Sequence, residues 1–95
     1  MSEQTIQIKL SGPFHAWAGG QKEIILPLAD GAILRDVLQR LVAWYPEFKK
    51  LSLEDDSALR ARAIFVQEGH ILSLTQQVKA GVALQVLVPI SGGGC

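Results

Sequence analysis

A single amphipathic stretch, residues 34–45, dominates the middle of this chain and limits what the chain can fold into. Its apolar residues recur at the spacing of one helical face, and polar residues occupy the opposite face. Pro46 follows the stretch and cannot continue a helix, so we expect the helix to end there. The apolar positions are Leu34, Val37, Leu38, Leu41, Val42 and Tyr45. One helix cannot bury this face alone, so the flanking segments must supply a partner layer.

Segments of alternating polarity flank the helix on both sides, as is typical of half-buried strands. The segments are 6–10, 23–28, 64–67 and 84–88. A long connection that contains Gly19-Gly20 joins the first two, and Pro89 closes the last. We interpret residues 49–60 as a loop with at most one short turn. Two strands, a helix and further strands fit a single sheet only as an α+β layer on that helix.

Alternation also predicts which side chains leave the core. If Ile64 and Val66 face the helix, Phe65 points to the solvent, and Leu87 has the same outward parity in the last strand. Together with Pro89 and Ile90, these two residues would form an apolar docking patch on the sheet. The alternative is that they are isolated exposed apolar side chains, which are ordinary on protein surfaces.

Residues 91–95, Ser91-Gly92-Gly93-Gly94-Cys95, are the most informative stretch for function. Three consecutive glycines lose much conformational entropy on ordering and have no side chain to pack, so we expect a flexible tail after a folded domain of residues 1–90. A backbone without Cβ atoms can enter a narrow channel, and from Ser91 to Gly94 it reaches roughly 13 Å when extended. The alternatives are a disordered end and a cloning scar.

The composition argues against several classes of protein. Nine basic and nine acidic residues cancel in a chain of 95, which leaves no electrostatic footprint for nucleic acid or an anionic membrane. No apolar run approaches the ~18–20 residues of a membrane span, and the first residues lack the features of a secretory signal. Cys95 is the only cysteine, so no internal disulfide can form. We therefore expect a cytosolic protein.

Residues with catalytic or metal-binding chemistry are scattered. The sequence has no phosphate-binding loop, no metal-ligand spacing and no recognisable catalytic triad. His15 and His70 lie far apart, which favours two surface histidines over a shared metal site. The acidic run Glu54-Asp55-Asp56 is most simply a solvated loop. We expect no catalytic residue, no metal and no bound cofactor, and therefore a protein on which other enzymes act.

The segment from Val86 to Gly93 resembles the closing motif of the MoaD/ThiS sulfur-carrier family. In that motif an apolar strand runs into proline, an aliphatic residue, a small residue and Gly-Gly. Gly19-Gly20-Gln21-Lys22 and Trp44-Tyr45-Pro46 resemble segments of the carriers that serve cysteine synthesis. The resemblance implies a β-grasp, ubiquitin-like fold with a mixed sheet packed on one main helix.

The chain also departs from the family pattern. Ala80-Gly81-Val82 stands where members often have Asp-Gly-Asp, Ile33 replaces a frequent Thr at the helix start, and Gln67 replaces a frequent Asn after the third strand. The largest departure is at the end, where Gly94 and Cys95 follow the diglycine.

The resemblance implies a carrier whose C-terminal glycine is adenylated by a ubiquitin-activating-type enzyme that uses ATP. A sulfur donor then forms a thiocarboxylate, which a sulfur-accepting enzyme of cysteine, methionine, molybdopterin or thiamine biosynthesis consumes. Phe65, Leu87 and residues 89–92 would contact these partners. Two other functions remain open, a ubiquitin-like protein modifier and the small subunit of a molybdopterin-synthase-like complex. The pathway, the sulfur donor and the oligomeric state are not readable from the sequence.

Cys95 bears on which glycine is activated. Alignment on Pro89-Ile90-Ser91 places the mature end at Gly93, whereas loss of Cys95 alone would leave Gly94. The resemblance implies that a zinc metallopeptidase of the JAMM type removes the extension. A second reading is that Gly-Cys mimics the carrier–cysteine adduct of the cysteine-synthesis carriers, and a third is that Cys95 is an incidental or cloning residue.

Overall fold

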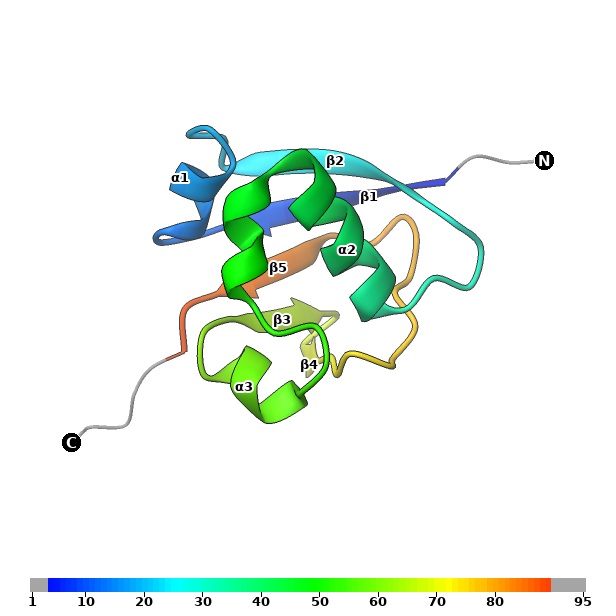
Figure 1. Cartoon of the computed structure of the whole chain (residues 1–95). Coiled ribbons are helices and arrows are strands. Elements are labelled where there is room, and N and C mark those ends of the chain that lie inside the picture. The colour runs from blue at the N-terminus through cyan, green and yellow to red at the C-terminus, as the bar shows by residue number, and fades with distance from the viewer. Residues whose placement is uncertain (1–3, 90–95) are drawn as a thin grey trace.

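Residues 4–89, the part of the chain that the computed structural model describes, form one mixed sheet with a helix lying across it (Figure 1). The elements are β1 (Gln4–Leu10), α1 (Phe14–Trp17), β2 (Glu23–Leu28), α2 (Leu34–Trp44), the 3-10 helix η1 (Pro46–Lys50), α3 (Asp56–Arg60), β3 (Ile64–Gln67), β4 (His70–Ile71) and β5 (Leu84–Leu87). The strand order is β2-β1-β5-β3-β4. Only β1 and β5 pair in parallel. The predicted α+β layer is confirmed.

The core lies between α2 and one face of the sheet. Alternate residues of β1 and β2 point toward the helix and are buried, whereas the residues between them are exposed on what we call the outer face. Four residues of the predicted helical stripe are buried, while Val42 and Tyr45 at its end are only half-buried. The buried set from these elements is Ile6, Ile8, Leu10, Ile24, Leu26, Leu28, Leu34, Val37, Leu38 and Leu41. The two periodicities of the sequence thus describe this layer correctly.

Helix α2 begins without a capping side chain of its own, as expected from Ile33. The carboxylate of Asp36 compensates for this, because its Oδ2 accepts a hydrogen bond of 3.0 Å from the backbone N–H of Ile33. This is one half of a capping box, and it satisfies one of the unpaired N–H groups at the helix start. The other end follows the prediction, since the helix ends at Trp44, before Pro46.

The interpretation of residues 49–60 as a loop is wrong, because η1 reaches Lys50 and α3 occupies the end of this segment. Asp55 begins α3, since its Oδ1 accepts a hydrogen bond of 3.0 Å from the N–H of Ser57. Asp56 ties the helix to a distant loop by accepting a 2.7 Å bond from the N–H of Leu74. The acidic run is therefore a helix start and a tertiary contact. Helices of five residues are too short to show periodicity.

The long connection between β1 and β2 contains the short helix α1, which closes one end of the core with aromatic rings. Phe14 is buried, and its ring lies edge-on to Trp17 with centroids 5.1 Å apart. Trp17 in turn meets Phe48 of η1 at 5.2 Å. Edge-to-face pairs of this kind stabilise the fold by more than their buried area alone provides.

No helix within residues 4–89 combines the length and the apolar character that a membrane span requires.

Candidate functional site

The candidate site is the end of β5, from which the chain continues toward the glycine run. β5 is the middle strand of the sheet, between β1 and β3. It leaves the sheet beside the connection that leads from β1 to α1, as Figure 1 shows. The predicted site residues Ile90, Ser91, Gly92, Gly93, Gly94 and Cys95 lie outside the described residues. The structure therefore defines the base of the tail, Val86 to Pro89.

Two residues that follow β1 hold this base. The hydroxyl of Ser11 donates a 2.8 Å hydrogen bond to the carbonyl of Val86, across 75 positions of sequence. Gly12 has a φ of +57°, and a Cβ placed on it would lie 2.7 Å from Cγ2 of Val88. Position 12 therefore needs glycine both for its backbone conformation and for its close approach to Val88. The sequence marks Gly12 only as the end of a strand, so this contact was missed.

Gly12→Ala should destabilise the protein by about 2–4 kcal/mol, through the cost of a positive φ and an overpacked contact. Gly81→Ala is the matched control, because Gly81 has a φ of +80° but open space around its would-be Cβ. It should cost only about 1–2 kcal/mol, for the backbone conformation alone. Urea unfolding of both variants measures the difference. Equal losses would show that the approach to Val88 places no demand on position 12.

The outward orientation predicted for Phe65 is wrong. Its side chain is only 1% exposed. The antiparallel register pairs Phe65 with the inward residue Val86, and it pairs Ile64 with Leu87. Paired residues share a face of the sheet, so Phe65 must point to the core while Ile64 turns outward. Phe65 is therefore removed from the candidate partner-binding residues.

Leu87 is exposed as predicted, and different neighbours surround it. Ile64 lies opposite Leu87, Val66 lies two residues along the same strand, and Ile71 of β4 pairs with Val66. Leu87 is 38% and Ile71 is 51% exposed, while the other two are half-buried. We call these four residues the outer apolar patch. Ile71 was missed because a strand of two residues leaves no pattern in the sequence.

The last residues before the tail also differ in part from expectation. Val88 was predicted to alternate inward with Val86, but β5 ends at Leu87 and Val88 is 47% exposed. Its exposed side chain extends the apolar surface from Leu87 toward Pro89, which is itself half-buried. An exposed apolar surface therefore lies at the base of the tail, with Ile64, Val66 and Ile71 where Phe65 was expected, and its role in docking stays a prediction.

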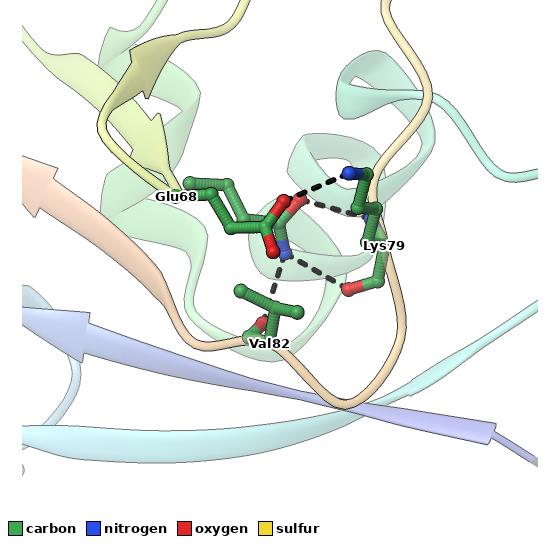
Figure 2. Close-up of polar contacts among 4 residues, drawn as sticks. Glu68, Lys79 and Val82 are labelled. Carbon is green, nitrogen blue, oxygen red and sulfur yellow. Dashed lines mark hydrogen bonds and ion pairs between the residues drawn. The ribbon is translucent and has the colours of Figure 1, made fainter.

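A buried glutamine fixes the loop that leads into β5. Gln67 is only 4% exposed, and its amide nitrogen donates to the carbonyls of Lys79 and Val82, both at 2.9 Å. Its amide oxygen accepts a 2.9 Å bond from the N–H of Lys79. Figure 2 shows the contacts that converge on Lys79 and Val82. A buried amide with these partners carries no unsatisfied group, which explains how a polar residue occupies an inward position of β3.

Glu68 adds a contact at the surface beside this buried amide. Glu68 lies in the turn between β3 and β4, where its φ is +54°. Its Oε1 lies 2.8 Å from Nζ of Lys79 (Figure 2). The hydrogen bond and the charge of Lys79 lower the pKa of Glu68. The pair is exposed, so it contributes little to stability. Gln67 and Glu68 thus contact Lys79 and Val82, which lie in and next to the segment Ala80-Gly81-Val82 that replaces the Asp-Gly-Asp of the family pattern.

Two classes of side chain that the sequence singled out can now be placed. Within residues 4–89, no group of three or more His, Cys, Asp or Glu side chains is placed to hold a metal ion. His15 lies on α1, which connects β1 with the edge strand β2, and His70 lies on β4, the strand at the opposite edge of the sheet. What the fold offers near the tail is a fixed exit and an apolar surface.

Comparisons with known proteins bear on this fold. No family model matches the chain, and no curated protein matches it. Small archaeal modifier protein 1 of Haloferax volcanii has a TM-score of 0.75 at 22% identity, over 92% of this chain and 99% of that one. The Pyrococcus furiosus protein assigned as molybdopterin converting factor, subunit 1, has a TM-score of 0.73 at 20% identity, over 92% and 99%. A chain of the BexX/CysO complex of Amycolatopsis orientalis has a TM-score of 0.72 at 19% identity, over 93% and 99%.

The chain has the β-grasp fold. Its structural neighbours are ubiquitin-like proteins of the MoaD, small archaeal modifier and CysO types, as the tail motif led us to expect. Their names are those of a subunit, a modifier and a component of a complex. At these identities the match concerns the fold, so the function of this β-grasp protein is argued below from its own residues.

Proposed function

We propose that this β-grasp protein is a sulfur carrier whose terminal glycine is adenylated and then converted to a thiocarboxylate. In the first step a glycine carboxylate oxygen attacks the α-phosphorus of ATP, and pyrophosphate leaves. In the second, a sulfur donor attacks the carbonyl carbon of the acyl-adenylate, and AMP leaves. A carboxylate is a poor electrophile until its oxygen becomes such a leaving group. Catalysis belongs to the partner enzyme, and the carrier delivers the reacting group.

The observation that carries this proposal is the fixed base of the tail followed by glycines. The Ser11 hydroxyl and the close approach of Gly12 hold Val86 and Val88, and the next residues include Gly92-Gly93. A rigid exit limits the volume that the reactive end has to search, while bare backbone suits a narrow active-site channel. A cytosolic location suits this chemistry.

The outer apolar patch supplies a surface on which the activating enzyme can dock. Ile64, Val66, Ile71 and Leu87 lie on β3, β4 and β5, beside the strand that leads to the tail. Apolar contacts near the centre of an interface contribute most of its binding energy. The CysO chain occurs in a complex with BexX, which supports a protein partner for this chain as well.

Processing precedes activation in this proposal. Residues beyond the diglycine displace its carboxylate, so a zinc metallopeptidase of the JAMM type removes either Gly94-Cys95 or Cys95 alone in this proposal. We expect no ATP–pyrophosphate exchange for the chain ending at Cys95, and exchange for chains ending at Gly93 or Gly94. The assay uses the activating enzyme of the same host. Equal exchange rates for all three chains would contradict the processing step.

Two alternatives share the same tail chemistry. Neighbours are named as a small archaeal modifier and as a subunit of molybdopterin converting factor, so a protein modifier and a synthase subunit both stay open. Mass spectrometry of protein purified from its own host separates the modifier from the other two. A terminal oxygen replaced by sulfur supports the carrier or the subunit, whereas branched peptides on lysines of other proteins support the modifier.

A further inference from the structure

Strand β2 is an edge strand with backbone groups that no described residue pairs. It pairs with β1 on one side only. The N–H of Leu10 donates to the carbonyl of Lys22 at 2.8 Å, which sets the alternation of the ladder. Even-numbered residues of β2 therefore bond to β1, and Glu23, Ile25 and Pro27 turn their backbone outward. Pro27 has no N–H, so the free edge offers the N–H groups of Glu23 and Ile25 and the carbonyls of all three.

Hollows lie between this edge and α2. Three of them share Ala29 and Arg40 in their lining, and together they extend from Gln4 and Pro27 to Trp44 at the end of α2. Because they share these residues, they adjoin one another beside the helix, and we call them together the groove. Of the outermost strand, β2, only Pro27 and Leu28 at its end line the groove. It is separate from the outer apolar patch, which lies on β3, β4 and β5.

Two of the three most exposed large apolar side chains among the described residues, Ile25 and Trp44, lie near this edge, and the third is Ile71 of the outer apolar patch. Ile25 is 61% exposed on the outer face of β2, and Trp44 is 51% exposed in the groove on the helix side. A strand laid along β2 would send alternate side chains to these two sides. Its apolar residues would then cover both Ile25 and Trp44, which lie in water in the chain alone.

Arg40 gives the groove its charge. The ion pairs within the described residues are Lys50 with Glu47 and Lys79 with Glu68, so the guanidinium of Arg40 has no carboxylate partner there. Asp36 also lines the groove, but its carboxylate caps α2 at the N–H of Ile33. The guanidinium of an arginine presents several donors in the geometry that a carboxylate accepts.

We propose that an extended segment of a partner protein, with alternating apolar side chains and one acidic residue, binds to β2 as an added strand. Its backbone pairs with Glu23 and Ile25, its apolar side chains cover Ile25 and Trp44, and its carboxylate binds Arg40. Strand addition of this kind takes affinity from backbone bonds and specificity from pockets for alternate side chains. Pro27 limits how far the pairing extends and so selects one register.

A second copy of the chain fits this edge less well. Antiparallel pairing about Ile25 would place each Pro27 opposite Glu23 of the other copy, so that both ends of a short pairing lose a hydrogen bond. Such a dimer would also give Arg40 no acidic partner from β2, because Glu23, the only acid of that strand, shares the outer face with Ile25, whereas Arg40 lies on the helix side. Self-association is therefore an outcome of the test rather than the proposal.

The test is selection of short random peptides displayed on phage against the full chain, followed by titration of an enriched synthetic peptide. We expect the enriched peptides to alternate apolar residues around one Asp or Glu. In NMR spectra the peptide should shift the amides of Glu23 and Ile25 and the indole of Trp44. Arg40→Glu should weaken binding about tenfold, as for a central interface arginine. Arg60→Glu, on α3 and equal in charge change, should leave the affinity unchanged.

Several results would overturn the proposal. These are no enrichment above the starting library, amide shifts at Ile64 and Leu87 instead of β2, or equal weakening by Arg40→Glu and Arg60→Glu. A peptide-free dimer that Ile25→Lys dissociates would assign the edge to self-association. None of these results depends on the tail, because Gly93→Val should bind the peptide normally. The proposal and the carrier function therefore fail separately.

Discussion

Phe65→Ser should destabilise the domain by about 3–5 kcal/mol, the cost of removing a large aromatic side chain from a packed core. Its side chain is 1% exposed and lies opposite Val86, between the sheet and α2. The replacement hydroxyl would also be buried within a cluster of apolar side chains. A domain of this size has only about 5–15 kcal/mol in total. Urea unfolding should therefore show a large loss of stability or an unfolded chain.

Leu87→Ser is the matched variant on the adjacent strand and the opposite face. Its side chain is 38% exposed, so the free energy of unfolding should change by less than about 1 kcal/mol. The same variant should weaken binding to the activating enzyme by on the order of 2 kcal/mol, because the outer apolar patch is the proposed docking surface. A stable Phe65→Ser would show that β3 is paired in the other register, with Phe65 on the outer face beside Leu87.

The parity of β3 shows where reading the sequence fails. Ile64, Phe65 and Val66 are apolar in succession, so alternation within the strand does not decide which of them face inward. Gln67 suggested that the odd positions were exposed, since an amide is usually at the surface. The assignment is reversed because Gln67 meets Lys79 and Val82 inside the domain, which removes the cost of burying it.

The elements predicted correctly are those with a local signal of sufficient length. Helix α2 follows its apolar stripe from Leu34 to Trp44, and β2 has the predicted bounds, Glu23–Leu28. Helix α3 and β4 are too short to show a period, and their positions depend on contacts such as the bond between Asp56 and Leu74. The local pattern of the sequence therefore predicts the main helix and the longer strands, whereas tertiary contacts determine where the short elements form.

One part of the candidate site could be predicted from the sequence, and another part could not. The glycine run is visible in the sequence itself, and the tail chemistry proposed for it stays a prediction. The hydrogen bond between Ser11 and Val86, which fixes the end of β5, could not be predicted from the sequence. The two residues lie 75 positions apart and become neighbours only through the parallel pairing of β1 with β5. The fold thus fixes the point from which the chain continues toward the glycine run.

Gly93→Val should abolish thiocarboxylate formation without changing the melting temperature. The buried core of the described residues lies between Ile6 and Val86, and glycine has no side chain that could pack against it. Valine places a β-branched side chain in a channel of glycine width and restricts the backbone next to the reacting carbonyl. The measurement compares two chains already shortened to residue 93, with Gly or with Val at the end, in the presence of the activating enzyme, ATP and a sulfur donor.

Gly93→Ala provides the graded control, because its single methyl group is smaller and lacks the β-branch. We expect it to retain more activity than Gly93→Val, in ATP–pyrophosphate exchange and in the mass shift of the thiocarboxylate alike. Thermal unfolding of all three chains should coincide, which would separate delivery of the tail from stability of the β-grasp domain. If Gly93→Val is activated and sulfurated at the normal rate, bare backbone is not what the partner selects. The glycine run would then give no reason to regard this chain as a sulfur carrier.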